Sequence, residues 1–247
     1  MADISQTPGR RFLIVGLPRS GTTYLMTLLN AHRDIVCSGE QFNPYAIVGV
    51  SGNNSDLADV TDRDRAPLYF MQRFFEEAET GEAARVGFKF MLGHNVRILR
   101  SLPDLPDLPI LYVWRENRLA QVSSLIKAAE TKRWAQSSPD DHLERRIKAG
   151  PRQISHRWHE FATMDTLFQE WLPSLPQPVL QLEYREMFRD GFEERVCDFL
   201  GVAHDPGMRS PLVKQGANTI LDRFENPAPI ERYFRTIGHD AWLEPEI

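Results

Sequence analysis

Short apolar runs alternate with longer amphipathic segments along the chain. The apolar runs are too short for typical helices and end at turn or polar residues, which predicts buried parallel strands. The predicted strands are residues 11–15, 34–38, 84–91, 109–114 and 178–183. Apolar residues at helical spacing predict helices at residues 22–31, 65–80, 94–103, 118–132, 140–171, 192–200 and 227–238, with one or two helices in the fifth of these. The alternation predicts an α/β fold in which helices flank a parallel β-sheet.

Outside this pattern the chain is polar. Residues 1–10 contain proline and glycine, and we predict a flexible N-terminus followed by a single domain over 11–247. Residues 50–64 are rich in Ser, Gly, Asn and Asp without periodicity, which predicts a surface loop. Because long insertions often carry substrate contacts, we expect 41–64 and 132–171 to bind a substrate.

Composition narrows the range of partners. The 247 residues carry a formal charge of −5 without a long run of one charge, so we expect no general binding to nucleic acid or anionic membrane. No apolar run approaches the roughly 18 residues that span a bilayer, and we expect a soluble, cytoplasmic protein. Cys37 and Cys197 are the two cysteines, and they are expected to be buried thiols without a metal.

A glycine-rich turn joins the first predicted strand to the first predicted helix. It reads Gly16-Leu17-Pro18-Arg19-Ser20-Gly21-Thr22-Thr23. In such a turn the free N–H groups of the helix N-terminus point to one place, where the helix dipole favours an anion. Hydroxyl side chains add donors, and Arg19 adds a cation that bonds phosphate or sulfate oxygens. The turn is therefore predicted to bind a nucleotide phosphate, and the alternative is a tight turn without a ligand.

The turn differs from the loop that binds magnesium triphosphates. That loop reads GxxxxGK[ST]; here the two glycines have its spacing, while Thr22 occupies the lysine position. The later strand that ends at Trp114 is followed by Arg115-Glu116-Asn117, without an obvious metal-binding aspartate. The turn therefore suits a single 5′-phosphate better than a magnesium triphosphate.

A second pair of polar residues predicts another anion site. Arg115 follows the strand at 109–114, and Ser123 lies eight residues later on the next predicted helix. An arginine at the carboxyl end of a strand and a serine on the following helix can converge on one phosphate. Such a pair also arises by chance, so it is evidence for a phosphate site only together with the glycine-rich turn.

Together the two motifs resemble the sulfotransferases that use 3′-phosphoadenosine 5′-phosphosulfate (PAPS). In that family a loop similar to PRSGTTYL holds the 5′-phosphosulfate, and an Arg-x7-Ser pair binds the 3′-phosphate. The resemblance implies a P-loop-like sulfotransferase fold. It implies a nucleotide site of Pro18, Arg19, Ser20, Gly21, Thr22, Thr23, Arg115, Ser123, Tyr184, Lys214, Gln215 and Gly216. Tyr184 looks like the tyrosine near the adenine, and Lys214 begins a segment similar to a late basic loop over the 3′-phosphate.

The dipeptide Gly39-Glu40 follows the second predicted strand. In this respect the chain resembles the bacterial carbohydrate sulfotransferases of the nodulation-factor and trehalose type, which use a glutamate at that position as base. Animal cytosolic sulfotransferases instead place a histidine two residues after a strand lysine, and here Lys89 is followed by Phe90-Met91. The resemblance implies an enzyme that transfers a sulfuryl group from PAPS, without a metal, to a hydroxyl acceptor such as a carbohydrate or glycolipid.

We hypothesise three catalytic residues, of which the resemblance implies the base, Glu40. Glu40 takes the proton of the acceptor hydroxyl, while Arg19 and Lys89 stabilise charge on the leaving phosphate and the transferring sulfuryl group. The alternatives are that Glu40 is a solvated loop carboxylate and that Lys89 reaches solvent from a strand end. His94 is expected to cap the helix that follows it, and the alternative is that it contacts the acceptor.

Two other functions fit the same pattern. A P-loop kinase for a small metabolite would need ATP and magnesium, which the threonine in place of the loop lysine disfavours. A non-catalytic protein that binds 3′-phosphoadenosine 5′-phosphate (PAP) would keep the fold without turnover. The acceptor stays open between a sugar, a lipid-linked sugar and a small alcohol.

Overall fold

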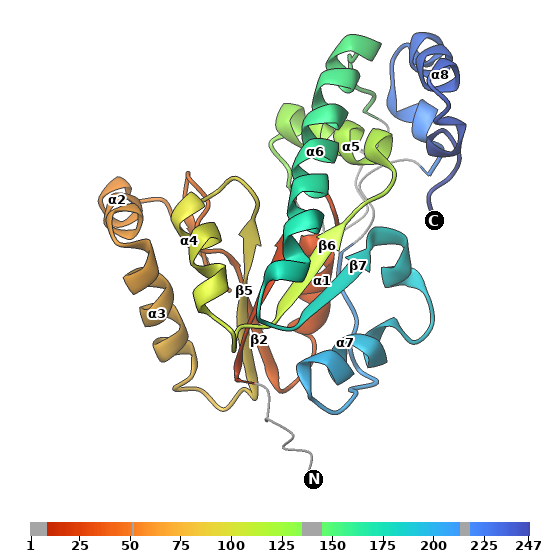
Figure 1. Cartoon of the computed structure of the whole chain (residues 1–247). Coiled ribbons are helices and arrows are strands. Elements are labelled where there is room, and N and C mark those ends of the chain that lie inside the picture. The colour runs from red at the N-terminus through yellow and green to blue at the C-terminus, as the bar shows by residue number, and fades with distance from the viewer. Residues whose placement is uncertain (1–8, 51, 135–144, 213–217) are drawn as a thin grey trace.

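Five parallel strands form the sheet at the centre of the protein (Figure 1). The computed structural model describes residues 9–50, 52–134, 145–212 and 218–247. The strands lie in the order β2-β5-β1-β6-β7. They are β1 (Arg11–Gly16), β2 (Ile35–Glu40), β5 (Arg85–Met91), β6 (Ile110–Trp114) and β7 (Val179–Glu183). The predicted α/β fold with a parallel sheet is confirmed. Residues 1–8 of the predicted flexible N-terminus lie outside the described residues.

The central strand is buried on both of its faces. Leu13 and Val15 of β1 belong to one hydrophobic core, and Phe12 and Ile14 belong to the other. A parallel strand between two helical layers needs apolar side chains on each face, so its sequence is a continuous apolar run. This is why the sheet can be predicted from the chain.

Helices cover both faces of the sheet. One face is covered by α1 (Thr22–Leu29) and α7 (Phe192–Leu200). The helices of the other core are α3 (Pro67–Ala78), α4 (Val96–Ser101), α5 (Arg118–Thr131), α6 (Pro151–Trp171) and α8 (Pro227–Thr236). In Figure 1, α3 and α4 lie at one end of this layer, and α8 lies beside α5 and α6 at the other. Over the described parts of the chain, none of these helices is long and apolar enough to cross a membrane.

The segment predicted as a surface loop at 50–64 contains regular structure. It contains β4 (Asn53–Asn54), which pairs in a hairpin with the preceding β3 (Ile47–Val48), and then α2 (Leu57–Arg65). The loop prediction was therefore wrong for residues 57–64. Only Val60 and Arg63 of α2 are buried, so this helix lacks the apolar periodicity that marks a helix in a sequence. Its N-terminus is instead stabilised by Asp56, whose side chain accepts two backbone hydrogen bonds.

The polar stretch before the last strand holds one long helix. α6 begins at Pro151, a residue that suits the first helical position because its ring fixes φ and it needs no hydrogen-bond partner for an N–H. The helix confirms the amphipathic pattern in the later part of 140–171. Residues 135–144 lie outside the described residues.

The carboxyl ends of the strands lie together at one edge of the sheet. Because β1, β2, β5 and β6 run parallel, the segments that follow them start at this edge. The chain passes from β5 on one side of β1 to β6 on the other, so the order of strands reverses at β1. Open α/β sheets bind ligands at such a point.

Candidate active site

The turn between β1 and α1 has an unusual backbone conformation. Gly21 has φ 110° and Arg19 has φ 63°, both at positive values that L side chains rarely adopt. A Cβ at Gly16 would lie 2.6 Å from the carbonyl oxygen of Val113, so the neighbouring strand excludes a side chain there. Gly21 is also the N-cap of α1 and brings no side chain of its own to cap it. The N–H groups of the first helical turn therefore face the loop, as an anion site requires.

The hydroxyl groups of the turn differ in their partners. Thr23 Oγ1 accepts a hydrogen bond of 2.7 Å from Lys89 Nζ, and Thr22 Oγ1 lies 3.8 Å from the sulfur of Met91. Among the described residues, the buried Oγ of Ser20 has no hydrogen-bond partner. A buried hydroxyl without a partner is destabilising, so an anionic ligand in the turn fits this residue.

Side chains from α5 and from the end of β6 hold the turn in place. Gln121 Nε2 donates to the carbonyl of Pro18 over 2.9 Å, and Arg115 donates to the carbonyl of Arg19 over 3.0 Å. Gln121 in turn accepts from Arg118, which forms a buried ion pair with Asp165 of α6. The conformation of the turn thus depends on packing between α5 and α6.

Glu40 is the last residue of β2, and a β-bulge decides which face of the sheet it occupies. The register between β2 and β5 shifts just before Glu40, so that Glu40 pairs with Lys89 and Gly39 is the extra residue. In a regular register Glu40 would stand opposite Phe90, on the other face. The bulge therefore brings the carboxylate to the face that carries Lys89 and α1.

Gly39 is needed because the hairpin packs against it. A Cβ at this position would lie 2.4 Å from Val48 Cγ1 and 2.9 Å from the Val48 carbonyl oxygen. The predicted strand 34–38 was too short by two residues at its end, since glycine and glutamate favour strands weakly. Glu40 therefore belongs to the strand, and it is not a loop carboxylate.

Lys89 links Glu40 to the glycine-rich turn. Its ammonium lies 3.0 Å from Glu40 Oε1 and donates to Thr23 Oγ1, and its side chain is 7% exposed. The other carboxylate oxygen, Glu40 Oε2, accepts a hydrogen bond of 2.7 Å from Asn43 Nδ2. Lys89 is thus a buried cation between a carboxylate and the turn, and it does not reach solvent from a strand end.

The surroundings of Glu40 keep it ionised. Burial raises the pKa of Glu40, but the charge of Lys89 and the hydrogen bond from Asn43 outweigh burial, so this pKa lies below its ordinary value. His94 is close enough to interact with Glu40, and burial lowers the pKa of His94. The predicted helix cap at His94 was wrong, because the side chain of Asn95 caps α4. Of the described groups near it, none bonds His94 Nδ1, which is buried.

A buried arginine from α2 fixes the backbone around Asn43. Arg63 donates to the carbonyl oxygens of Gln41 at 3.1 Å and Asn43 at 2.8 Å, and its side chain is 1% exposed. Part of the insertion predicted at 41–64 therefore positions Asn43, the hydrogen-bond partner of Glu40.

Replacing Asn43 by alanine is expected to raise the pKa of Glu40, because a donor to the ionised carboxylate is lost. The depressed pKa contributes stability above the ordinary glutamate value, and this contribution is lost as the pH falls through the folded pKa. As the pH falls, the variant should therefore lose this stability at a higher pH than the wild type does. The acid limb of kcat/KM should also move to higher pH. A carboxyl-labelled NMR titration of Glu40 measures the shift.

The matched control for this change is Asn54→Ala, because the side-chain amide of Asn54 donates a similar hydrogen bond to the exposed carboxylate of Asp59, over 2.6 Å. The control should leave the titration of Glu40 where it is in the wild type. A titration of Glu40 that is the same in the Asn43 variant would contradict this account of the low pKa.

A second group of cations lies on the opposite side of the turn. Arg115 stacks 4.0 Å above the ring of Tyr184 and forms a two-point ion pair with Glu246, in which Nε donates to Oε1 over 2.6 Å. Arg19 belongs to this group because it interacts with the charge of Arg115, and its Nε donates to Ser124 Oγ over 2.9 Å. Burial and the charge of Arg115 lower the pKa of Arg19 to about 10. The structure thus places Arg19 with Arg115 and Tyr184.

Arg223 is a member of this group that was not predicted from the sequence. It donates to Ser123 Oγ over 3.1 Å, and burial and then Arg115 lower its pKa to about 10. Its backbone carbonyl accepts a hydrogen bond from Ile147 N over 2.8 Å. Arg223 lies 100 residues after Ser123 without a motif around it, so no local signal identifies it.

Most of the predicted nucleotide-site residues lie around the turn. Pro18 to Thr23 form the turn itself, and Arg115, Ser123 and Tyr184 flank it. A Cβ at Gly21 would lie 2.8 Å from Tyr184 Cδ2, so the turn and the tyrosine are in close contact. Lys214, Gln215 and Gly216 lie outside the described residues.

The sequence of this chain is similar to known proteins over most of its length. Residues 11–206 match the family model described as the sulfotransferase family. Nodulation protein H of Rhizobium tropici is 25% identical over 234 residues, which cover 90% of this chain and 88% of that protein. Nodulation protein H of Rhizobium meliloti strain 1021 is 25% identical over 139 residues, which cover 55% and 54%. The predicted likeness to the nodulation-factor branch is confirmed.

The fold agrees with that match. The sulfotransferase domain of the olefin synthase of Synechococcus PCC 7002 superposes with a TM-score of 0.52 at 14% identity, over 94% of this chain and 90% of that one. The predicted P-loop-like sulfotransferase fold is confirmed. This chain belongs to the sulfotransferase family, and it is an enzyme of sulfuryl transfer.

Proposed function

We propose that this enzyme transfers the sulfuryl group of PAPS to a hydroxyl of a carbohydrate or glycolipid. The observation that carries the proposal is the chain of contacts from Glu40 through Lys89 to Thr23. It joins an ionised carboxylate to the turn that suits a 5′-phosphate. A base for the acceptor and a cradle for the donor are the two parts that this reaction needs.

Each proposed catalytic residue has a role that its surroundings support. Glu40 is held ionised and accepts the proton of the acceptor hydroxyl while the acceptor oxygen bonds to sulfur. At the same time the bond between sulfur and the bridging oxygen breaks, and PAP leaves with the electron pair on its 5′-phosphate. Lys89 lies between Glu40 and the turn, where a cation stabilises charge on the transferring group. Arg19 is proposed to act on the leaving phosphate, in agreement with its place among the arginines of the nucleotide side.

The donor is proposed to bind across the turn with its 3′-phosphate at the second group of cations. Ser20 and the N–H groups of α1 hold the 5′-phosphosulfate, while Arg115 and Ser123 hold the 3′-phosphate. Tyr184 flanks the adenine. Arg223 joins the predicted pair because it bonds the hydroxyl of Ser123. We propose that no metal is required, since these cations neutralise the charge that magnesium neutralises in kinases.

The acceptor class rests on likeness to named relatives. Similarity to nodulation protein H extends over 90% of this chain, which supports an acceptor of the carbohydrate or glycolipid kind. We propose that the insertions at 41–64 and 132–171 contact it. A cytoplasmic site of action is proposed as well.

Calorimetric titration with PAP, and separately with ATP and magnesium, tests the donor. We expect saturable binding of PAP and none of ATP with magnesium. Binding of magnesium-ATP alone would favour the small-molecule kinase. Binding of PAP without sulfation of any sugar, glycolipid or alcohol in an acceptor panel would favour the non-catalytic PAP-binding protein.

A further inference from the structure

Glu246 is a buried carboxylate in the proposed nucleotide site. Its side chain is 1% exposed, and both of its oxygens accept from Arg115, whose side chain is 6% exposed. The third nitrogen of the same guanidinium donates to the carbonyl of Arg19. Glu246 therefore occupies the edge of the guanidinium, Nε and Nη2, through which Arg115 makes two parallel hydrogen bonds. A phosphate binds an arginine through the same two-point geometry.

Three arginines and two carboxylates, Glu246 and Glu183, lie around this contact, so its charge is positive on balance. Arg19, Arg115 and Arg223 lie close enough together that Arg115 lowers the pKa of each of the other two, after burial. Burial lowers the pKa of Arg115 itself, but Glu246 outweighs burial and holds that pKa above its ordinary value. A single carboxylate carries one negative charge, whereas a phosphate monoester carries up to two. The cluster is thus better matched to a phosphate than to Glu246.

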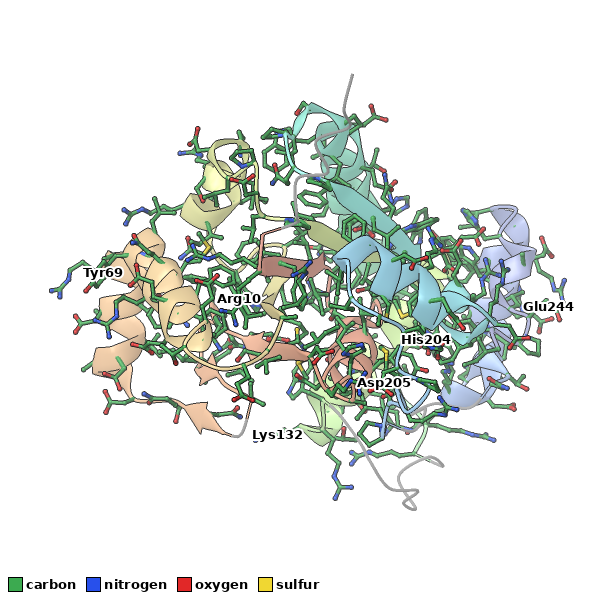
Figure 2. All side chains as sticks on the ribbon, turned by 90° about the horizontal axis from the view of Figure 1, so that it is seen from below. Arg10, Tyr69, Lys132, His204, Asp205 and Glu244 are labelled. Atoms are coloured by element: carbon green, nitrogen blue, oxygen red, sulfur yellow. The ribbon has the colours of Figure 1, made fainter. Side chains whose placement is uncertain are left out.

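The segment that carries Glu246 is anchored at Trp242 and Leu243, just before it. Asn117, the N-cap of α5, donates to the carbonyl of Trp242 over 3.0 Å, and Leu243 is buried in the core. Beyond Leu243 the chain is exposed at Glu244 and Pro245. Glu244 lies at the outer edge of the molecule in Figure 2. Release of Glu246 from Arg115 therefore requires movement of a short segment and leaves the core intact.

We propose that Glu246 is a built-in competitor of the nucleotide 3′-phosphate, which closes on Arg115 in the free enzyme and leaves when the donor binds. The inference rests on the proposed PAPS site. Donor binding is then coupled to displacement of residues 244–246. The exposure of the neighbours of Glu246 allows this displacement, and the excess positive charge of the cluster favours the phosphate.

The test compares Glu246→Gln with the exposed control Glu244→Gln by calorimetry. Because the apparent affinity is the intrinsic affinity multiplied by the fraction of open enzyme, Glu246→Gln is expected to tighten PAP binding about tenfold, which corresponds to a wild-type enzyme that is about nine-tenths closed. Glu244→Gln should bind PAP like the wild type. Adenosine 5′-phosphosulfate, which lacks the 3′-phosphate, should bind all three proteins equally. PAP binding by folded Glu246→Gln that is unchanged or weaker overturns the proposal.

Two further measurements cover failure of the variant or of the proposed donor. If Glu246→Gln does not fold, Glu246→Asp keeps the charge with a shorter reach, and we expect a smaller gain in PAP affinity from it; no gain overturns the proposal. If the wild type binds no PAP, the proposed donor is wrong. Thermal shifts with inorganic phosphate then decide this inference, since greater stabilisation of Glu246→Gln than of wild type supports it and equal stabilisation overturns it.

Discussion

Replacing Glu40 by glutamine is expected to lower kcat by about 10²- to 10⁴-fold, the usual contribution of a general base. The amide keeps the shape of the side chain and an oxygen for Lys89, but it does not accept the acceptor proton. Affinity for PAP should change little, because the described nucleotide-side contacts belong to other residues. The measurement pairs calorimetry with PAP and release of PAP from PAPS in the presence of sugar and glycolipid acceptors.

Glu76→Gln is the matched control for this change, since Glu76 is an exposed carboxylate on α3 that accepts a hydrogen bond from Gln72. It should turn over like the wild type. Turnover in Glu40→Gln that equals the wild type would remove Glu40 from the mechanism. Equal loss of turnover and of PAP affinity would indicate a structural role at the turn instead.

Arg115→Gln is expected to weaken PAP binding by about 10- to 100-fold, because a hydrogen bond to a charged group contributes roughly 1.5–3 kcal/mol. The loss should be specific to the 3′-phosphate, so adenosine 5′-phosphosulfate should bind the variant almost as it binds the wild type. Arg157→Gln is the control, because Arg157 is an exposed arginine on α6 that pairs with Glu160.

The same substitution belongs in a second background as well. Arg115→Gln leaves Glu246 buried without its cation, which costs stability and complicates the comparison. Measuring the change with Glu246→Gln already present removes that complication. A loss of affinity that is the same for PAP and for adenosine 5′-phosphosulfate in both backgrounds would place Arg115 away from the 3′-phosphate.

The sheet and the glycine-rich turn could be predicted because their signals are local. A strand buried on both faces is an apolar run, as in β1, and the turn is a continuous set of glycines, hydroxyls and an arginine. α2 could not be predicted from periodicity. Its stability depends on one buried arginine, Arg63, and on the cap at Asp56, and neither produces an apolar stripe.

The parts of the site that were missed depend on contacts between distant segments. Arg223 reaches Ser123 across 100 residues, and Glu246 reaches Arg115 across 131. Both side chains contact the cluster because they are buried beside it, but burial of a charged side chain is a property of the packed fold. In the sequence they are two of many charged residues without a distinguishing neighbour.

The bulge at Gly39 means that counting along β2 does not place the proposed base on the correct face of the sheet, whereas pairing with the adjacent strand does. Glu40 reaches the ammonium group because it stands opposite Lys89, and the extra residue, Gly39, gives it that register in the space that the hairpin leaves. A distant relative that lost both the glycine and the bulge would bring its glutamate opposite the same lysine. Searches for this chemistry should therefore align the carboxylate to the lysine of the adjacent strand, and should not require a glycine before it.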